Sequence, residues 1–321
     1  MRWPRLLPRV APVCLTVLGV RAAQAQAWVP PKGEASLTLG LASSFADQHL
    51  DDYGHNITLP SGVGWGSMRW NDADGSVGYG ITDRLAVQVG LPFVISRYQG
   101  QVAHPPLAGH RNEDDGHWHA TCGDFRAEVR FKATTGTLVV TPLAAFSVPS
   151  HSYEYYAHAT AGLGLARGQV GVNIGRLLDP LLPGAYVQAR YTFTLPEKVL
   201  GMSHNRSNVY LDAGYLVTSA VTVSFIGEWQ KTHGGWRTVD VPPPTDPNFL
   251  YHDQLLRSDH LRLGGTVSYA LTGSLDVGLS GYGTVYGHSD MNLAELALSL
   301  TYNFSPSQLI KKSRTPVGKA P

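Results

Sequence analysis

The stretch LALSLTYNF, residues 296–304, decides the fold of this chain. Its large apolar side chains occupy every second position, and small or polar residues lie between them. The apolar set is Leu296, Leu298, Leu300, Tyr302 and Phe304. Because successive side chains of a β-strand point to opposite faces, this alternation predicts a strand with one apolar and one polar face. The apolar face needs either a protein core or lipid beside it.

The overall composition narrows that choice. Only 15% of residues are charged, Gly contributes 35 residues, and Tyr and Trp contribute 15 and 7. A mean hydropathy of −0.10 is too polar for a bundle of membrane helices, whereas the charge content is low for a water-soluble domain. The net charge of +1, without a basic block, gives no reason to expect nucleic acid as a partner.

The first 27 residues have the pattern of a cleavable signal peptide. Three arginines precede an apolar run over 10–20, and AQAQA at 23–27 offers two small-residue cleavage sites. An uncleaved anchor is the alternative, but the run is about half as long as a membrane-spanning helix. We therefore expect an exported chain whose mature form begins at Gln26 or Trp28.

Alternation of the same kind recurs in segments of about ten residues, the length that a tilted strand needs to cross a membrane. The pattern predicts twelve strands, near 34–45, 67–81, 84–97, 122–134, 137–148, 159–176, 184–195, 206–217, 220–232, 257–271, 274–287 and 292–304. The alternation changes phase near Arg167, and we expect one long strand with a bulge over 159–176.

Short connections alternate with long polar ones. YGITDRLAV, YLVTSAVTV and YALTGSLDV, which begin at 79, 215 and 269, share a threonine before the next strand and predict two-residue hairpin turns. Thr135 marks a fourth turn. The long connections lie near 46–66, 98–121, 149–157, 196–205 and 233–256. An even strand number, with short turns at one end and long loops at the other, is typical of outer-membrane barrels.

We therefore predict an all-β protein, a transmembrane antiparallel up-and-down β-barrel of about twelve strands over 28–304. The signal peptide precedes it and a flexible periplasmic tail follows over 305–321. The apolar face of 296–304 then contacts outer-membrane lipid, and this closing strand pairs with the first and is presented to the barrel-insertion machinery. The expected location is the outer membrane of a Gram-negative cell. A soluble β-sandwich explains single strands, but not their combination with export and asymmetric loops.

Four segments resemble a known family of outer-membrane proteins. They are SVGYGITDRLAVQVGLPFV (76–94), GDFRAEVRFKA (123–133), FSVPS (146–150) and AGLGLA (161–166). Together they are similar to the MetA-pathway of phenol degradation family, whose members are described as outer-membrane β-barrel transporters. The resemblance covers most of 34–304 and implies a barrel that passes small hydrophobic or aromatic compounds. It transfers no catalytic residue, because the family has no agreed one.

Charged residues on the polar faces of the predicted strands are expected to line the lumen. They are Arg126, Glu128, Arg130, Lys132, Arg190, Asp212, Glu228, Arg262, Asp276 and Glu295. Such residues either set a solute preference or form ion pairs that brace the lumen. Both signs are present, which favours ion pairs. Three of the four charges over 126–132 are positive, which predicts a mild anion preference if the lumen conducts.

The segment GHRNEDDGHWHATCGD, residues 109–124, offers a candidate metal site. Its candidate ligands are His117, His119 and Cys122, with Asp114 or Asp115. These residue types bind Zn²⁺ or Cu²⁺. The spacing is not that of a structural zinc motif, so a plain surface loop is the alternative. No dinucleotide-binding or phosphate-binding pattern occurs, and we expect no cofactor.

The function that these observations favour is a passive channel for small, aromatic or hydrophobic molecules, and not an enzyme. A lipid hydrolase is one alternative, since a junction of loop and strand brings together Ser203, His204, Asn205 and Ser207. However, neighbouring residues on a strand point to opposite faces, so Ser203 and His204 would not converge. A structural or adhesive surface barrel, using the Pro-rich loop over 239–254, is the other alternative.

Overall fold

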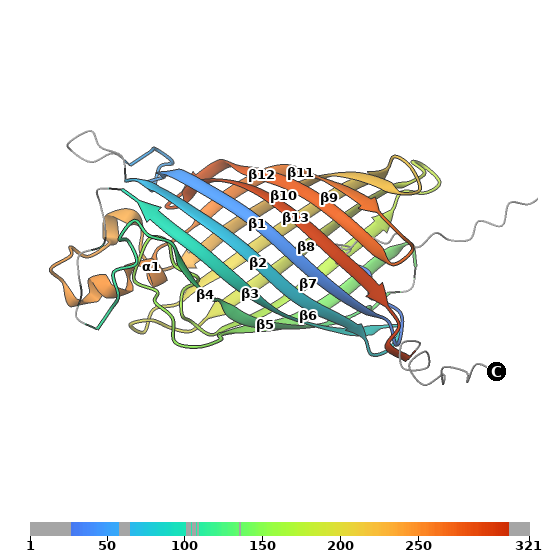
Figure 1. Ribbon diagram of the computed structural model, residues 1–321, viewed down its shortest axis with the longest axis horizontal. Helices are drawn as coiled ribbons and strands as arrows, with labels where there is room; N and C mark the ends of the chain where they lie inside the picture. Colours follow the sequence, from blue (N-terminus) through green and yellow to red (C-terminus); the bar gives the residue numbers. More distant parts are fainter. Residues whose placement is uncertain are drawn as a thin grey trace, which may run out of the picture.

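The computed structural model describes residues 27–57, 65–100, 104, 107, 109–134 and 136–307. In these residues thirteen strands form one antiparallel sheet that closes on itself (Figure 1). The strands are β1 Ala35–His49, β2 Ser67–Gly80, β3 Leu85–Gln99, β4 His119–Cys122, β5 Asp124–Phe131, β6 Leu138–Pro149, β7 Arg167–Leu177, β8 Ala185–Pro196, β9 His204–Leu216, β10 Val221–Gly234, β11 Asp259–Ala270, β12 Leu275–His288 and β13 Met291–Phe304. Because β4 and β5 pair with successive parts of β3, they share one position in the wall. The prediction of a twelve-stranded barrel is confirmed.

The strand β13 shows the two environments of the wall. Leu296, Leu298 and Leu300 point outward with 60%, 45% and 41% of their surface exposed, whereas Thr301 points inward and is 2% exposed. Thr301 meets Thr38 of β1 inside the barrel, with 2.9 Å between the hydroxyl oxygens. An outward apolar row and an inward polar row are the arrangement of a barrel surrounded by lipid, as predicted for this strand.

One predicted strand is wrong in its extent. β7 begins at Arg167, and residues 159–166 belong to the preceding loop, in which Ala159 and Leu165 are buried. The phase change near Arg167 marks the start of a strand and not a bulge within one. Because the chain does not turn back at this point, the directions of all later strands are as predicted.

The three threonine turns are four residues long, not two. In the first, the Thr82 hydroxyl accepts hydrogen bonds from the backbone N–H groups of Arg84 and Leu85, at 3.2 and 2.9 Å. Thr218 and Thr272 accept backbone N–H groups in the same way. A threonine at this position satisfies turn donors with its side chain, which explains the repeated sequence pattern.

The beginning of the described chain lies inside the barrel, at the end that carries the short turns. The N–H of Ala27 donates to Gln188 Oε1 at 3.3 Å, and its carbonyl accepts from the Thr141 hydroxyl at 2.6 Å. Gly175 of β7 leaves room for this segment, because a Cβ at that position would lie 2.5 Å from the Ala27 Cβ. The segment therefore occupies part of the lumen.

Three expectations fall mainly outside the described residues: the signal peptide over 1–27, of which only Ala27 is described, the Thr135 turn, and the tail from 308 onward. They remain predictions. Within the part of the chain that the structure describes, no helix is long and apolar enough to cross a membrane.

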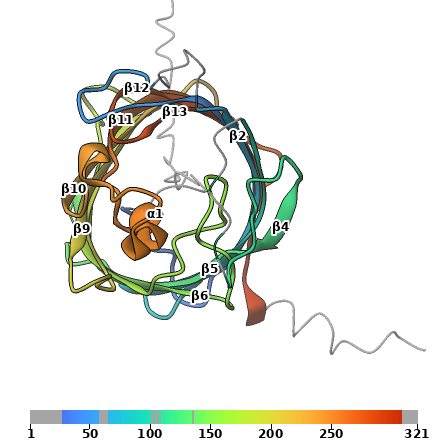
Figure 2. The same ribbon diagram turned by 90° about the vertical axis from the view of Figure 1, so that its left-hand side faces the viewer.

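Two long loops fold into the opposite end of the barrel (Figure 2). One connects β6 to β7 over 150–166, and the other connects β10 to β11 over 235–258. The second contains η1 Thr238–Asp240, η2 Pro247–Tyr251 and α1 His252–Leu255. Leu255 is fully buried and packs with Leu165 and Val199. The two loops therefore hold each other across the mouth of the lumen.

Candidate functional site

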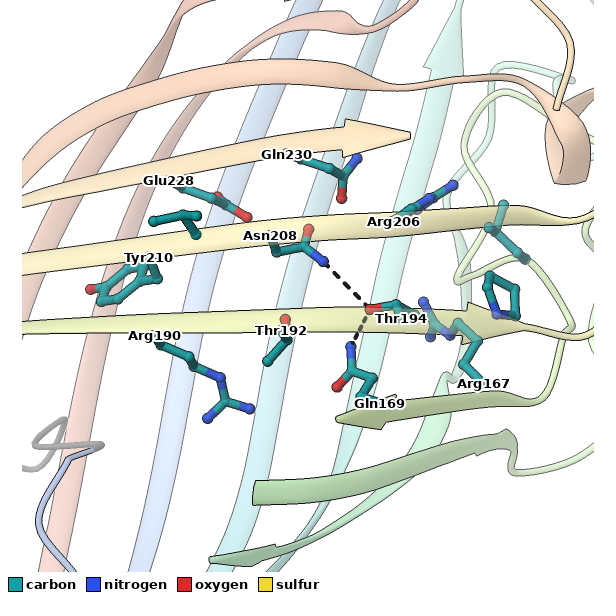
Figure 3. Close-up of a pocket in the computed structure, with 13 residues that line it drawn as sticks. Arg167, Gln169, Arg190, Thr192, Thr194, Arg206, Asn208, Tyr210, Glu228 and Gln230 are labelled. Carbon is teal, nitrogen blue, oxygen red and sulfur yellow. Dashed lines mark hydrogen bonds between the residues drawn. The ribbon is translucent and has the colours of Figure 1, made fainter. Parts of the chain in front are cut away.

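A cavity of about 320 Å³ lies in the lumen just inside these loops (Figure 3). Its walls are the inward faces of β7, β8, β9 and β10, and Leu163 contributes from the loop above. The polar lining residues are Arg167, Gln169, Arg190, Thr192, Thr194, Arg206, Asn208, Tyr210, Glu228 and Gln230. Three arginines and one glutamate give the lining a positive excess. The volume is at the lower end of the roughly 300–1,000 Å³ of small-molecule sites.

The neutral part of this lining is held by hydrogen bonds between strands. The Thr194 hydroxyl of β8 accepts from Gln169 of β7 at 2.9 Å and from Asn208 of β9 at 3.4 Å (Figure 3). Inward positions of a strand repeat every two residues, which is why Arg206, Asn208 and Tyr210 all reach the cavity. The amide and hydroxyl groups are thus fixed before any solute enters.

Two of the cavity arginines have carboxylate partners. Arg190 binds Glu128 of β5 through its two terminal guanidinium nitrogens, Nη2 at 2.5 Å and Nη1 at 3.4 Å. Glu128 also lies 3.4 Å from the Nε of Arg130. Arg167 pairs with Asp124 at the start of β5. These pairs neutralise most of the charge on this side of the lumen.

Arg206 is the exception. Among the described residues it has no ion pair, and its buried Nε atom has no hydrogen-bond partner. Arg206 is not among the lumen residues predicted from the sequence, although its side chain is on the same face of β9 as that of Asp212, which was predicted. The alternation alone therefore contained the signal that places Arg206 in the lumen.

The other predicted lumen residues are spread along the barrel. Arg126 pairs with Asp74 of β2, and Glu228 and Arg262 are 3.8 Å apart. Lys132 lies just beyond β5, in the connection to β6. These residues do not share one site.

The remaining three acidic residues bind neutral side chains. Asp212 accepts hydrogen bonds from the Tyr186 hydroxyl and from Gln188, at 3.2 and 2.8 Å. Asp276 accepts from Asn303 at 3.1 Å, and Glu295 accepts from Ser44 at 2.7 Å. Hydrogen bonds of this kind help to satisfy a buried carboxylate.

The predicted metal ligands are brought together only in part. His117 and His119 both contact Asp115, at 3.4 and 2.9 Å, on the outer part of their loop. Cys122 is in β4, opposite Phe93 of β3. In the part of the chain that the structure describes, this set is not among the groups whose three ligand atoms lie within 4.8 Å of one another.

Three loops instead meet at a buried cluster of histidines and carboxylates in the mouth. His104 and Asp114 come from the loop between β3 and β4, His158 from the loop between β6 and β7, and His252 and Asp253 from α1. The side chains of His104 and Asp114 are 3% and 0% exposed. Sequence reasoning missed this cluster, because its members are separated by long stretches of chain and follow no short motif.

The charges in this cluster are strongly coupled. Burial lowers the pKa of His104, but the neighbouring carboxylates of Asp114 and Asp253 outweigh burial and raise it to about 9. Burial raises the pKa of Asp114, but hydrogen bonds from His104 and His158 reverse this effect and hold it well below its usual range. The two carboxylates therefore favour a positive charge beside His104.

The residues considered for a hydrolase take a different arrangement. Ser207 and His233 face outward near the mouth, with 2.9 Å between the Ser207 hydroxyl and His233 Nε2. His204 is fully buried and lies on the opposite face of β9. No described carboxylate lies within ion-pair distance of His233. A nucleophile and base without an orienting group lack one part of a catalytic triad.

Comparisons with known proteins give the fold a context. No family model matches the chain, and no curated protein matches it significantly. Among solved structures, an outer-membrane channel from Pseudomonas putida F1 is similar with a TM-score of 0.67 and 11% identity, over 88% of this chain and all of that chain. The translocator domain of the autotransporter NalP from Neisseria meningitidis is similar with a TM-score of 0.49 and 11% identity, over 86% of this chain and 90% of that chain. At such identities only the fold is established, and the chain has the fold of an outer-membrane β-barrel.

Proposed function

We propose that the protein is a passive outer-membrane channel for small molecules, and that its cavity favours solutes with a carboxylate group. The observation that carries this proposal is the cavity beneath the loops, with three arginines in its lining, one of which has no ion-pair partner among the residues that the structure describes. A guanidinium binds a carboxylate through two parallel hydrogen bonds, so an anionic solute suits Arg206. Three further considerations support the proposal.

The first is charge. Arg206, which has no ion-pair partner among the described residues, adds a positive charge to a narrow lumen, and such a charge raises the local concentration of anions and lowers that of cations. The second is size, because the loops over 150–166 and 235–258 lie across the mouth and restrict entry to small solutes. The third is the resemblance to the MetA-pathway of phenol degradation family, which favours aromatic compounds. Small aromatic carboxylates satisfy all three considerations.

The proposal includes the outer membrane as the location and lipid as the partner of the outward apolar face. Leu296 to Phe304, as the closing strand, would be the segment that the insertion machinery recognises. The signal peptide over 1–27 would direct export. A carboxylate-selective channel in this place has no need of a bound cofactor.

The test is the conductance of the refolded protein in a planar bilayer under a salt gradient, with benzoate and then neutral benzyl alcohol added. We expect discrete steps, a reversal potential that favours anions, and a current altered by benzoate only. Arg206→Gln should lower the anion preference several-fold. Arg176→Gln, which removes an arginine from the outward face of β7, is the matched control and should leave it unchanged. A folded barrel without steps, or a preference unaltered in Arg206→Gln, refutes the proposal.

A further inference from the structure

Two histidine rings and one carboxylate point at a common centre in the mouth of the barrel. His104 Nε2 lies 3.0 Å from His252 Nε2 and 3.1 Å from Asp253 Oδ2, and these atoms are all within 4.8 Å of one another. His104 belongs to the loop after β3, whereas the other two residues belong to α1, 148 positions further along the chain. Two separate loops thus supply the three atoms.

The far side of each ring is already occupied by an acceptor. His104 Nδ1 lies 2.6 Å from the Asp114 carboxylate, and His252 Nδ1 lies 2.6 Å from the carbonyl oxygen of Phe249. Because a carboxylate and a carbonyl can only accept, each Nδ1 carries the hydrogen. In this tautomer the Nε2 lone pairs of the two rings face each other when no proton lies between them, and a bound cation would satisfy both.

The carboxylate supplies an independent observation. Asp253 Oδ2 is buried and forms no hydrogen bond of good geometry among the described residues, although it faces the two rings. A buried carboxylate oxygen without a hydrogen-bond donor is costly, and a bound cation satisfies it. The three atoms, two ring nitrogens and one oxygen, are all of the kinds that bind metals in proteins.

We propose that His104 Nε2, His252 Nε2 and Asp253 Oδ2 form a binding site for one divalent transition-metal ion, for which zinc is the best match. Two imidazoles and one carboxylate, with a fourth position left open, are a ligand set that zinc uses. Two ligands about 2.0–2.1 Å from a tetrahedral zinc ion lie about 3.3 Å apart, so the site accepts the ion with a few tenths of an ångström of opening. Asp114 accepts the hydrogen bond of His104 Nδ1, and a carboxylate at the second ring nitrogen orients a zinc-bound histidine.

The neighbouring group of His104, Asp114 and His158 is a poorer choice. Asp114 Oδ2 lies 2.5 Å from His158 Nδ1 and 2.6 Å from His104 Nδ1, and it also accepts the backbone N–H of His158 at 3.2 Å. A metal at this place would have to displace the hydrogens from both rings. Asp114 therefore orients the rings and does not bind the ion.

A metal ion at this position would join two loops that come from distant parts of the chain. One loop leaves β3 and the other carries α1, which lies within the ring of strands seen in Figure 2. An ion bound only by the folded mouth stabilises the folded mouth, by linkage. The site does not depend on what the channel transports.

The test uses full-length mature protein refolded without a histidine tag and treated with a chelator. Zinc chloride alone is titrated by calorimetry, and the metal content is measured after desalting. Cobalt is then bound in place of zinc, because its visible absorption distinguishes a four-coordinate ion from a loosely bound ion that keeps most of its water ligands. We expect one zinc per chain and a four-coordinate cobalt spectrum.

Variants locate the site. His252→Ala and Asp253→Asn should each weaken zinc binding by more than about 100-fold, and Asp114→Asn by about 10–100-fold. The double variant His117→Ala with His119→Ala removes two histidines of the loop before β4 that lie outside the site, and it is the matched control, which should bind zinc like the wild type. Heat-modifiable migration on a gel shows that each barrel is folded. A chelator-treated wild type that binds no zinc, or loss of binding only in the control variant, overturns the proposal.

Discussion

Arg190 of β8 reaches past β7 and β6 to bind Glu128 of β5 through two nitrogens, with 2.5 Å between Nη2 and Oε2. A pair with this two-point geometry fixes both side chains and neutralises the Arg190 charge in the cavity lining. Five of the ten charged residues predicted for the lumen contact one another: Glu128 contacts Arg190 and Arg130, and Glu228 contacts Arg262 at 3.8 Å.

Removal of the negative partner should make the lumen more selective for anions. Glu128→Gln leaves the Arg190 charge without its carboxylate while keeping a side chain of similar shape. We expect the reversal potential in a salt gradient to shift toward the equilibrium potential of chloride. Glu34→Gln, on an exposed residue before β1, removes the same charge outside the lumen and should leave the potential unchanged. Equal potentials in both variants would contradict a selective role for the lumen charges.

Loosening of the loop over 150–166 should widen the mouth. The Tyr153 hydroxyl donates to Asp124 at the start of β5 and accepts the N–H of Gly164 at 3.2 Å. Tyr153→Phe removes both bonds and retains the ring, so we expect a larger or more variable single-channel conductance. Tyr155→Phe, two residues later in the same loop, is the control. The prediction fails if the two variants give the same conductance histogram as the wild type.

A charge on the lipid face should destabilise the barrel. Leu298 lies at the middle of β13 and points outward with 45% of its surface exposed. Leu298→Arg should lower the free energy of unfolding by about 2–4 kcal/mol, the cost of arginine at the midplane of a bilayer. Leu298→Ala, which stays apolar, should cost less. Urea unfolding in lipid vesicles measures the free energy of unfolding of both variants. An arginine variant as stable as the alanine variant would contradict a lipid-facing position for Leu298.

The threonine turns should each contribute a small, local part of the stability. Thr82→Ala removes the hydroxyl that accepts from Arg84 and Leu85, and should lower the free energy of unfolding by about 0.5–1.5 kcal/mol. Thr82→Ser keeps the hydroxyl and should retain most of that stability. The same unfolding measurement compares the two, and a serine variant as unstable as the alanine variant would rule out the hydrogen bonds as the cause.

The sequence alone predicted the barrel because its strand signal is local. Lipid outside and a polar lumen inside force a period of two on every strand, so LALSLTYNF already fixed which residues of β13 face outward. Strand number and direction followed from the alternation and the turns. The one error of extent, over 159–166, arose because a buried loop segment is as apolar as a strand and merges with it in sequence.

The tertiary structure alone decided what the lumen and its mouth contain. Alternation placed Glu128 and Arg190 inside, but their pairing depends on barrel curvature, which brings β5 near β8. His104 and His252 meet only because two loops fold inward, and loop packing depends on contacts between residues 148 positions apart. The sequence determined the wall through a periodic, local rule, whereas the sites depend on long-range packing that no local rule encodes.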